Sequence, residues 1–141
     1  DPATAKNAKL LRRTTFGLSP DRLADLSTKD YPSAVSLLLN EQPLAFEPPQ
    51  ADGEQDYEDV NDMVEWWKES MYSGGLHERM AWFWHGLLTT HRNDSGGFVY
   101  LRRQLTLLRT NALGNYRNML HEFVKDGALL NYLDGAGSTA R

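Results

Sequence analysis

The chain has 141 residues, 40% hydrophobic and 24% charged, which suits one globular domain with a single core. The formal net charge is −4 and the basic residues are scattered from Lys6 to Arg141, a pattern that does not favour a nucleic-acid-binding protein. There is no cysteine, which excludes disulfides and thiolate metal sites, and no apolar run approaches the roughly 18 residues of a membrane span.

The first 42 residues predict three short helices. Residues 1–17 are rich in helix formers and end in Gly17, which favours a helix that closes there. The Ser-Pro-Asp sequence at 19–21 supplies a capping side chain, a proline suited to the first turn and an acid, so a second helix is predicted to begin there. A third helix is predicted from Tyr31 until shortly before Pro43.

Residues 43–58 lack helical periodicity and contain several prolines and a glycine, so they predict a surface loop. Eight acidic residues and no Lys or Arg lie between Glu47 and Glu65. Their spacing does not match a calcium-binding loop, and a solvated acidic loop is therefore favoured over a cation site.

The rest of the chain predicts five more helices. Helical spacing of apolar residues predicts one helix from Asp59 to the Ser-Gly-Gly turn at 73–75, and another from Leu76 to about Thr90. Turn residues separate three further predicted helices, which span 98–112, 116–124 and 128–133. No segment has the alternation of a strand. The predicted class is all-α, an irregular orthogonal or bundle-like array of about seven or eight helices in a single domain over residues 1–141.

The segment from Glu78 to His85 (ERMAWFWH) lies in the fifth predicted helix. At about 100° per residue, the residues of this helix fall into two stripes on opposite sides, and each stripe has the same spacing of three or four residues. One stripe, predicted to face the core, consists of Leu76, Met80, Phe83 and Leu87. The opposite stripe consists of Glu78, Trp82, His85 and Thr89. Because Trp buries a large apolar area, the second stripe is also predicted to be covered, and Trp82 is a candidate binding residue.

Two interpretations of Glu78 and His85 stay open. They either point into a cavity as acid/base groups or metal ligands, or are buried polar groups bonded to Arg, Tyr or backbone partners. A self-contained metal site is disfavoured, because seven residues separate their backbones by roughly 10 Å, whereas helical metal ligands are normally three or four residues apart. No cofactor is identified by these residues.

Arg102 and Arg109 share a polar helix face with Thr106. Guanidinium groups bind carboxylates and phosphates bidentately, so these arginines are a candidate anion clamp. A role as partner of Glu78, or plain exposure to solvent, is the favoured alternative.

Three stretches carry a resemblance to a known family: LLRRTTFGLSP at 10–20, LHERMAWFWHGLL at 76–88 and LRTNALGNYRNMLHEFVKDGALLNYLDG at 108–135. They resemble the bacterial family called domain of unknown function 1800. The resemblance implies that the protein is large and helical. Most members of the family are predicted to be exported from bacteria, and the reaction they perform, if any, is not established. The family usually has a second His where this sequence has Leu87, which weakens a two-His metal site.

The family pattern also continues past the Leu-Asp-Gly element at 133–135 into an Asn-Glu-Asn stretch and an Arg- and Glu-rich helix. The chain reaches Arg141 before them, so we expect it to be the N-terminal part of a larger domain.

Three functional hypotheses follow. The chain is a helical module that binds another protein or an extracellular polymer through exposed aromatics, with Trp66, off the apolar stripe of its helix, as the motivating residue. Alternatively, it supplies half of an active site, of a metal-assisted hydrolase or an oxidoreductase, through Glu78 and His85. In the third hypothesis these two residues are purely architectural.

Overall fold

The computed structural model describes residues 2–43, 45, 48–49 and 57–138, apart from the side chains of 57–60 and 136. This part of the chain contains eight α-helices, one short 3-10 helix and no strand, which confirms the all-α class. The helices are α1 (Pro2–Thr14), α2 (Pro20–Ser27), α3 (Tyr31–Leu39), α4 (Tyr57–Ser73), α5 (Leu76–Leu87), α6 (Phe98–Thr110), α7 (Tyr116–Phe123), α8 (Gly127–Tyr132) and the 3-10 helix η1 (Gly135–Gly137). The predicted acidic loop over 43–58 lies mostly outside the described residues.

Several helices begin where a side chain accepts a hydrogen bond from the first turn. Ser19 accepts from the backbone N–H of Arg22 at the start of α2, and Asp30 accepts from Ser33 at the start of α3. Asn115 and Asp126 play the same part for α7 and α8. Such caps satisfy backbone donors that a helix leaves unpaired, and they explain why these predicted starting points are confirmed.

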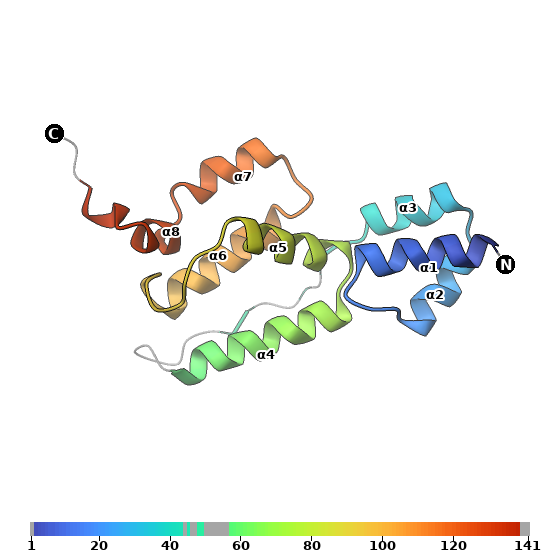
Figure 1. The fold of residues 1–141 in the computed structure, drawn as a ribbon, viewed down its shortest axis with the longest axis horizontal. Helices are drawn as coiled ribbons and strands as arrows, with labels where there is room; N and C mark the ends of the chain where they lie inside the picture. The colour runs from blue at the N-terminus through green and yellow to red at the C-terminus, as the bar shows by residue number, and fades with distance from the viewer. Residues whose placement is uncertain (1, 44, 46–47, 50–56, 139–141) are drawn as a thin grey trace.

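Helices α1 to α3 form one packed unit at the N-terminal end of the molecule (Figure 1). Its core consists of Leu11, Leu26, Ala34 and Leu38. Asn7 is buried in the same unit, and its side-chain amide donates to the backbone oxygen of Leu26 over 2.7 Å. A polar side chain of α1 thereby closes the C-terminal end of α2.

Helix α6 lies at the centre of the remaining helices, in contact with α4, α5, α7 and α8 (Figure 1). Two apolar clusters hold them together. Met63, Trp66, Phe98 and Leu105 join α4 to α6. Leu108, Met119 and Phe123 join α6 to α7. The expectation that Trp66 lies off the core is wrong, since only 6% of it is exposed.

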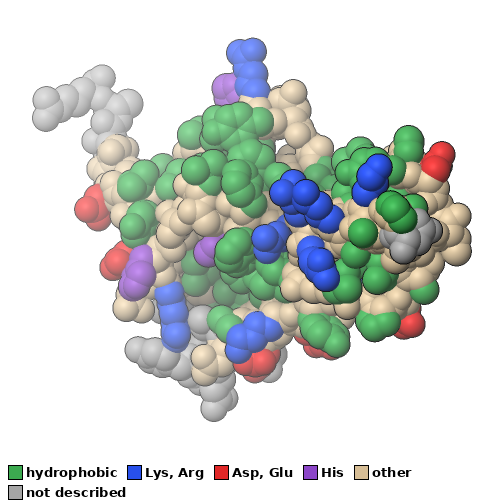
Figure 2. Space-filling view, turned by 45° about the vertical axis from the view of Figure 1, so that its right-hand side comes forward, with side chains coloured by type: hydrophobic (Ala, Val, Ile, Leu, Met, Phe, Trp, Pro, Cys, Tyr) green, Lys and Arg blue, Asp and Glu red, His purple; other side chains and the backbone are tan. Residues whose placement is uncertain are grey.

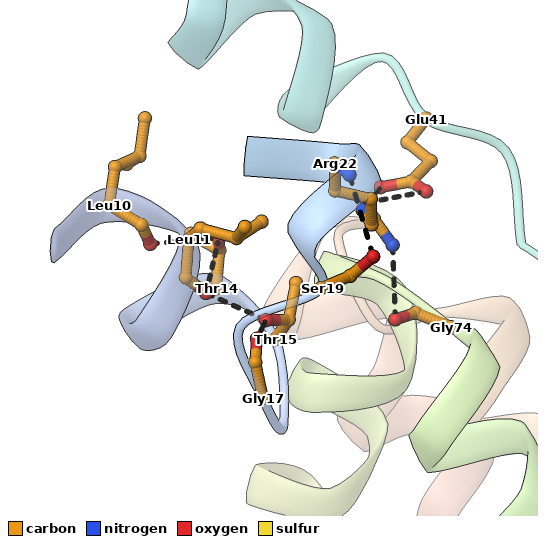
Figure 3. Close-up of polar contacts among 9 residues, drawn as sticks. All are labelled: Leu10, Leu11, Thr14, Thr15, Gly17, Ser19, Arg22, Glu41 and Gly74. Atoms are coloured by element: carbon orange, nitrogen blue, oxygen red, sulfur yellow. Dashed lines mark hydrogen bonds and ion pairs between the residues drawn. The ribbon is translucent and has the colours of Figure 1, made fainter. Parts of the chain in front are cut away.

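Arg22 connects the two groups of helices (Figure 3). One Nη atom lies 2.7 and 2.6 Å from the two carboxylate oxygens of Glu41, and the other donates to the backbone oxygen of Gly74 over 3.2 Å. Gly75 lies so close to this pair that an added Cβ would meet the Glu41 carboxylate. The α4–α5 turn is therefore fixed against the N-terminal unit through α2.

None of the helices within the described residues is both long enough and apolar enough to span a membrane.

Candidate functional site

Glu78 lies in the first turn of α5 and is buried, with 1% of its surface exposed. The helix begins directly after the Gly74-Gly75 turn. An added Cβ at Gly74 would run into the side chain of Glu78 and the backbone oxygen of Ser70, so only glycine lets the end of α4 approach this carboxylate so closely. The turn thus directs Glu78 toward the interior.

The carboxylate of Glu78 is paired with Arg109 of α6. Arg109 Nε lies 3.0 Å from both carboxylate oxygens, and Nη2 lies 2.6 Å from Oε1. The guanidinium carbon also lies 4.9 Å from the centre of the Trp66 ring, in cation–π geometry. The interpretation of Arg109 as the partner of Glu78 is confirmed. A buried carboxylate already held by a guanidinium is poorly suited to accept a substrate proton.

His85 lies two turns further along α5, half-buried against α4. Its ring meets that of Trp67 edge to face, with the centroids 4.7 Å apart. Burial lowers the pKa of His85, because the charged imidazolium loses hydration there. No hydrogen bond to a ring nitrogen of His85 is present within the described residues, so the predicted polar partner is not found among them. His85 thus lies at the α4–α5 interface, where burial favours the uncharged form of its ring.

Helix α5 faces the protein with the side opposite to the one predicted. Phe83 and Leu87, predicted to lie in the core, are 50% and 58% exposed, whereas Glu78 and Ala81 are buried. The prediction for Phe83 and Leu87 is wrong because both sides of α5 carry apolar residues. The side that faces α6 and α7 is the one with Ala81, Trp84 and Leu88, where Glu78 also contacts Arg109.

Trp82 is exposed to 48%, so the expectation that its stripe is covered is wrong at this position. Its ring meets the Phe16 ring edge to face, with centroids 6.0 Å apart. The guanidinium carbon of Arg79 lies 5.0 Å from the Phe16 centroid and 5.4 Å from that of Trp82. The three side chains connect α5 to the loop between α1 and α2.

Arg102 does not join Arg109 in an anion clamp. Its Nε atom donates to the backbone oxygen of Pro48 over 3.2 Å, while the guanidinium of Arg109 is committed to Glu78. Among the residues that the structure describes, no group of three His, Asp or Glu side chains is placed to hold a metal ion.

The sequence did not suggest a second buried polar group, centred on Gln104 of α6. The Thr90 hydroxyl donates to Gln104 Oε1 over 2.7 Å, and Gln104 Nε2 donates to Asp126 over 2.8 Å. Asp126 also caps α8. The Asp before a Gly-Ala-Leu run signals the cap, but no local signal marks Gln104 as buried. This network fixes α8 on α6.

Comparisons with known proteins give one result. A family model described as "Protein of unknown function (DUF1800)" matches residues 9–141. No curated protein and no solved structure matches the chain.

Proposed function

The chain belongs to the DUF1800 family of proteins of unknown function, and on that premise we propose that it is a binding and scaffold module of a larger, exported bacterial protein. The exposed outer side of α5 is its docking surface. The occupant is a helix of the same polypeptide, the Arg- and Glu-rich helix that the family resemblance places after the Leu-Asp-Gly element.

The observation that supports this proposal is the apolar outer side of α5. Leu76 and Met80 are half-buried there, and Phe83 and Leu87 are exposed to about half of their surface. Their spacing of four, three and four residues forms a continuous stripe along the helix, the pattern that packs between the side chains of a second helix. Apolar surface that is continuous along an exposed helix can serve as an interaction surface for a second helix.

Energetics and charge are consistent with a helical occupant. Covering the exposed halves of Phe83 and Leu87 would contribute on the order of 2 kcal/mol, since full burial of each is worth about 1.5–3 kcal/mol. Arg79 lies on the same outer side of α5, next to Trp82. A glutamate on the incoming helix would find its counter-charge there.

Thiol labelling tests this proposal, because the natural chain has no cysteine. Leu87→Cys provides a thiol at the C-terminal end of this stripe, the only one within residues 1–141. We expect it to react rapidly with a thiol reagent in residues 1–141 alone, and several-fold more slowly in the family protein that also contains the Arg- and Glu-rich helix. Tyr72→Cys, at a side chain on α4 that is 92% exposed, is the matched control and reacts rapidly in both. Equal rates for Leu87→Cys in the two proteins would contradict the proposal.

A second candidate function is favoured by the burial of His85 and by its lack of a hydrogen-bond partner among the described residues. A half-buried imidazole whose pKa is lowered by burial, and which has no hydrogen-bond partner among the described residues, is suited to act as a base or a metal ligand once further residues are supplied. In this alternative the module contributes half of an active site of a metal-assisted hydrolase or oxidoreductase. Elemental analysis of the longer protein and of its His85→Ala variant tests whether His85 is a metal ligand. If the two proteins contain the same amount of metal, or if neither contains any, His85 is not a metal ligand.

A further inference from the structure

Helix α1 carries a strong local positive charge in an acidic protein. It contains Lys6, Lys9, Arg12 and Arg13 and no acidic residue, although the whole chain has a net charge of −4. All four side chains are exposed. None of them takes part in an ion pair within the part of the chain that the structure describes.

Three of these cations line one hollow of the surface. Lys6, Lys9 and Arg13 follow one another along the outer side of α1 and border a pocket of 410 Å³ with Leu10 and Tyr31. Figure 2 shows basic side chains grouped among hydrophobic ones in the middle of one face, with acidic side chains toward its edge. Asp30, the acid next to Tyr31 in sequence, caps α3 by accepting from the backbone of Ser33.

The helix itself does not account for this arrangement. Arg12 and Arg13 lie in the last turn of α1, where positive charge is stabilised by the helix dipole. Lys6 lies in the first half of α1, outside the last turn where that effect acts. A solvated helix face would also usually mix both signs of charge, which α1 does not.

We propose that this hollow binds a phosphorylated ligand. Two ammonium groups and one guanidinium suit a group with several oxygens and more than one negative charge, which a phosphate monoester or a diphosphate provides and a single carboxylate does not. Leu10 and the Tyr31 ring line the same pocket and leave apolar surface for the organic part of the ligand. A free phosphorylated compound and a lipid headgroup share this chemistry.

Two binding measurements at low ionic strength distinguish these sources. Calorimetric titration with inorganic pyrophosphate tests the free compound. Co-sedimentation with phosphatidylcholine vesicles, with and without phosphatidic acid, tests the headgroup. We expect binding in at least one arm, weakened by added salt because the cations are exposed. Binding to pyrophosphate supports a free ligand, and binding only to vesicles that contain phosphatidic acid supports a lipid.

The decisive comparison uses two triple variants with the same change in net charge. Lys6→Gln, Lys9→Gln and Arg13→Gln together should weaken binding by about tenfold, because each exposed charge contact contributes a fraction of a kcal/mol. The control combines Lys68→Gln, Arg117→Gln and Lys125→Gln, at exposed positions on other helices or beyond them, and should bind like the natural chain. Absence of binding in both arms, or the same loss in the control, would overturn the proposal.

Discussion

The inner and outer sides of α5 differ in chemistry and in surroundings. The inner side places Glu78 and Ala81 against the rest of the protein, with the Glu78 carboxylate held by Arg109. The outer side presents Phe83 and Leu87 to solvent. An ordinary amphipathic surface helix buries its apolar stripe and exposes its charges, whereas α5 buries the charged Glu78 and leaves the apolar Phe83 and Leu87 half exposed.

The contrast shows that the inner side of α5 combines apolar packing through Ala81, Trp84 and Leu88 with one strong polar contact. Removing two charges from water is costly, and only a well-formed pair with several short bonds offsets that cost. The Glu78–Arg109 pair has that geometry. The apolar outer stripe is then available to another helix, which is the basis of the proposed scaffold role.

Removing the inner ion pair should have the largest effect. Arg109→Met leaves the Glu78 carboxylate buried without its partner, and we expect the free energy of unfolding to fall by about 3–5 kcal/mol. Urea denaturation followed by circular dichroism measures this change. Arg103→Met, at an exposed position of the same helix, is the control and should change stability by less than about 0.5 kcal/mol. Similar losses in the two variants would show that the ion pair does not orient α5.

Alanine substitutions at two glycines, Gly74 and Gly86, compare the inner and outer sides of α5. In Gly74→Ala the new methyl group meets the Glu78 side chain and a backbone oxygen, and we expect a loss of about 1–3 kcal/mol. Gly86 lies on the outer side of α5, and a Cβ added there meets nothing within 4 Å. Gly86→Ala should therefore stabilise the protein by about 0.5–1 kcal/mol through helix propensity. Thermal denaturation of both variants gives the signs, and a loss at Gly86 would indicate that the outer side is already covered.

The sequence predicted the helices better than their orientation. Caps such as Ser19, and breaks such as Gly74-Gly75, are local signals that act within a few residues, and they placed most helix boundaries closely. The inner side of α5 depends on Arg109, which is 31 residues away from Glu78 in sequence. Helical periodicity cannot choose between two apolar stripes when the deciding contact is this distant.

In the candidate site, too, the sequence predicted local features better than long-range contacts. The sequence predicts a pairing of Glu78 with an arginine as one of two alternatives, because Arg109 lies on a polar face of its helix. The contact of Arg22 with Gly74, 52 residues away, had no counterpart in any local pattern. Long-range polar contacts of this kind appear only once the helices are packed.

His85, at the α4–α5 interface, should make stability depend on pH. Burial lowers its pKa in the folded protein, so on acidification the unfolded chain binds this proton first. Its contribution to the free energy of unfolding is complete above the ordinary His pKa of about 6.5 and is lost as the pH falls below that value. We expect a smaller effect than at Gly74. Urea denaturation over a series of pH values, compared with His85→Gln, measures it, and identical pH dependence in the two proteins would contradict the assignment.

The outer side of α5 should give the smallest effect on stability. Phe83→Gln and Leu87→Gln together remove apolar surface that is half exposed and replace it with good helix formers, so we expect a loss of less than about 1 kcal/mol in residues 1–141. In a family protein that contains the Arg- and Glu-rich helix, the proposed docking predicts a clearly larger loss, because the same double variant would remove the surface on which that helix is proposed to pack. Urea denaturation of both proteins, with and without the substitutions, gives the difference. If the loss is equally small in both proteins, the outer side of α5 is exposed in both. The apolar outer side would then have no role in docking.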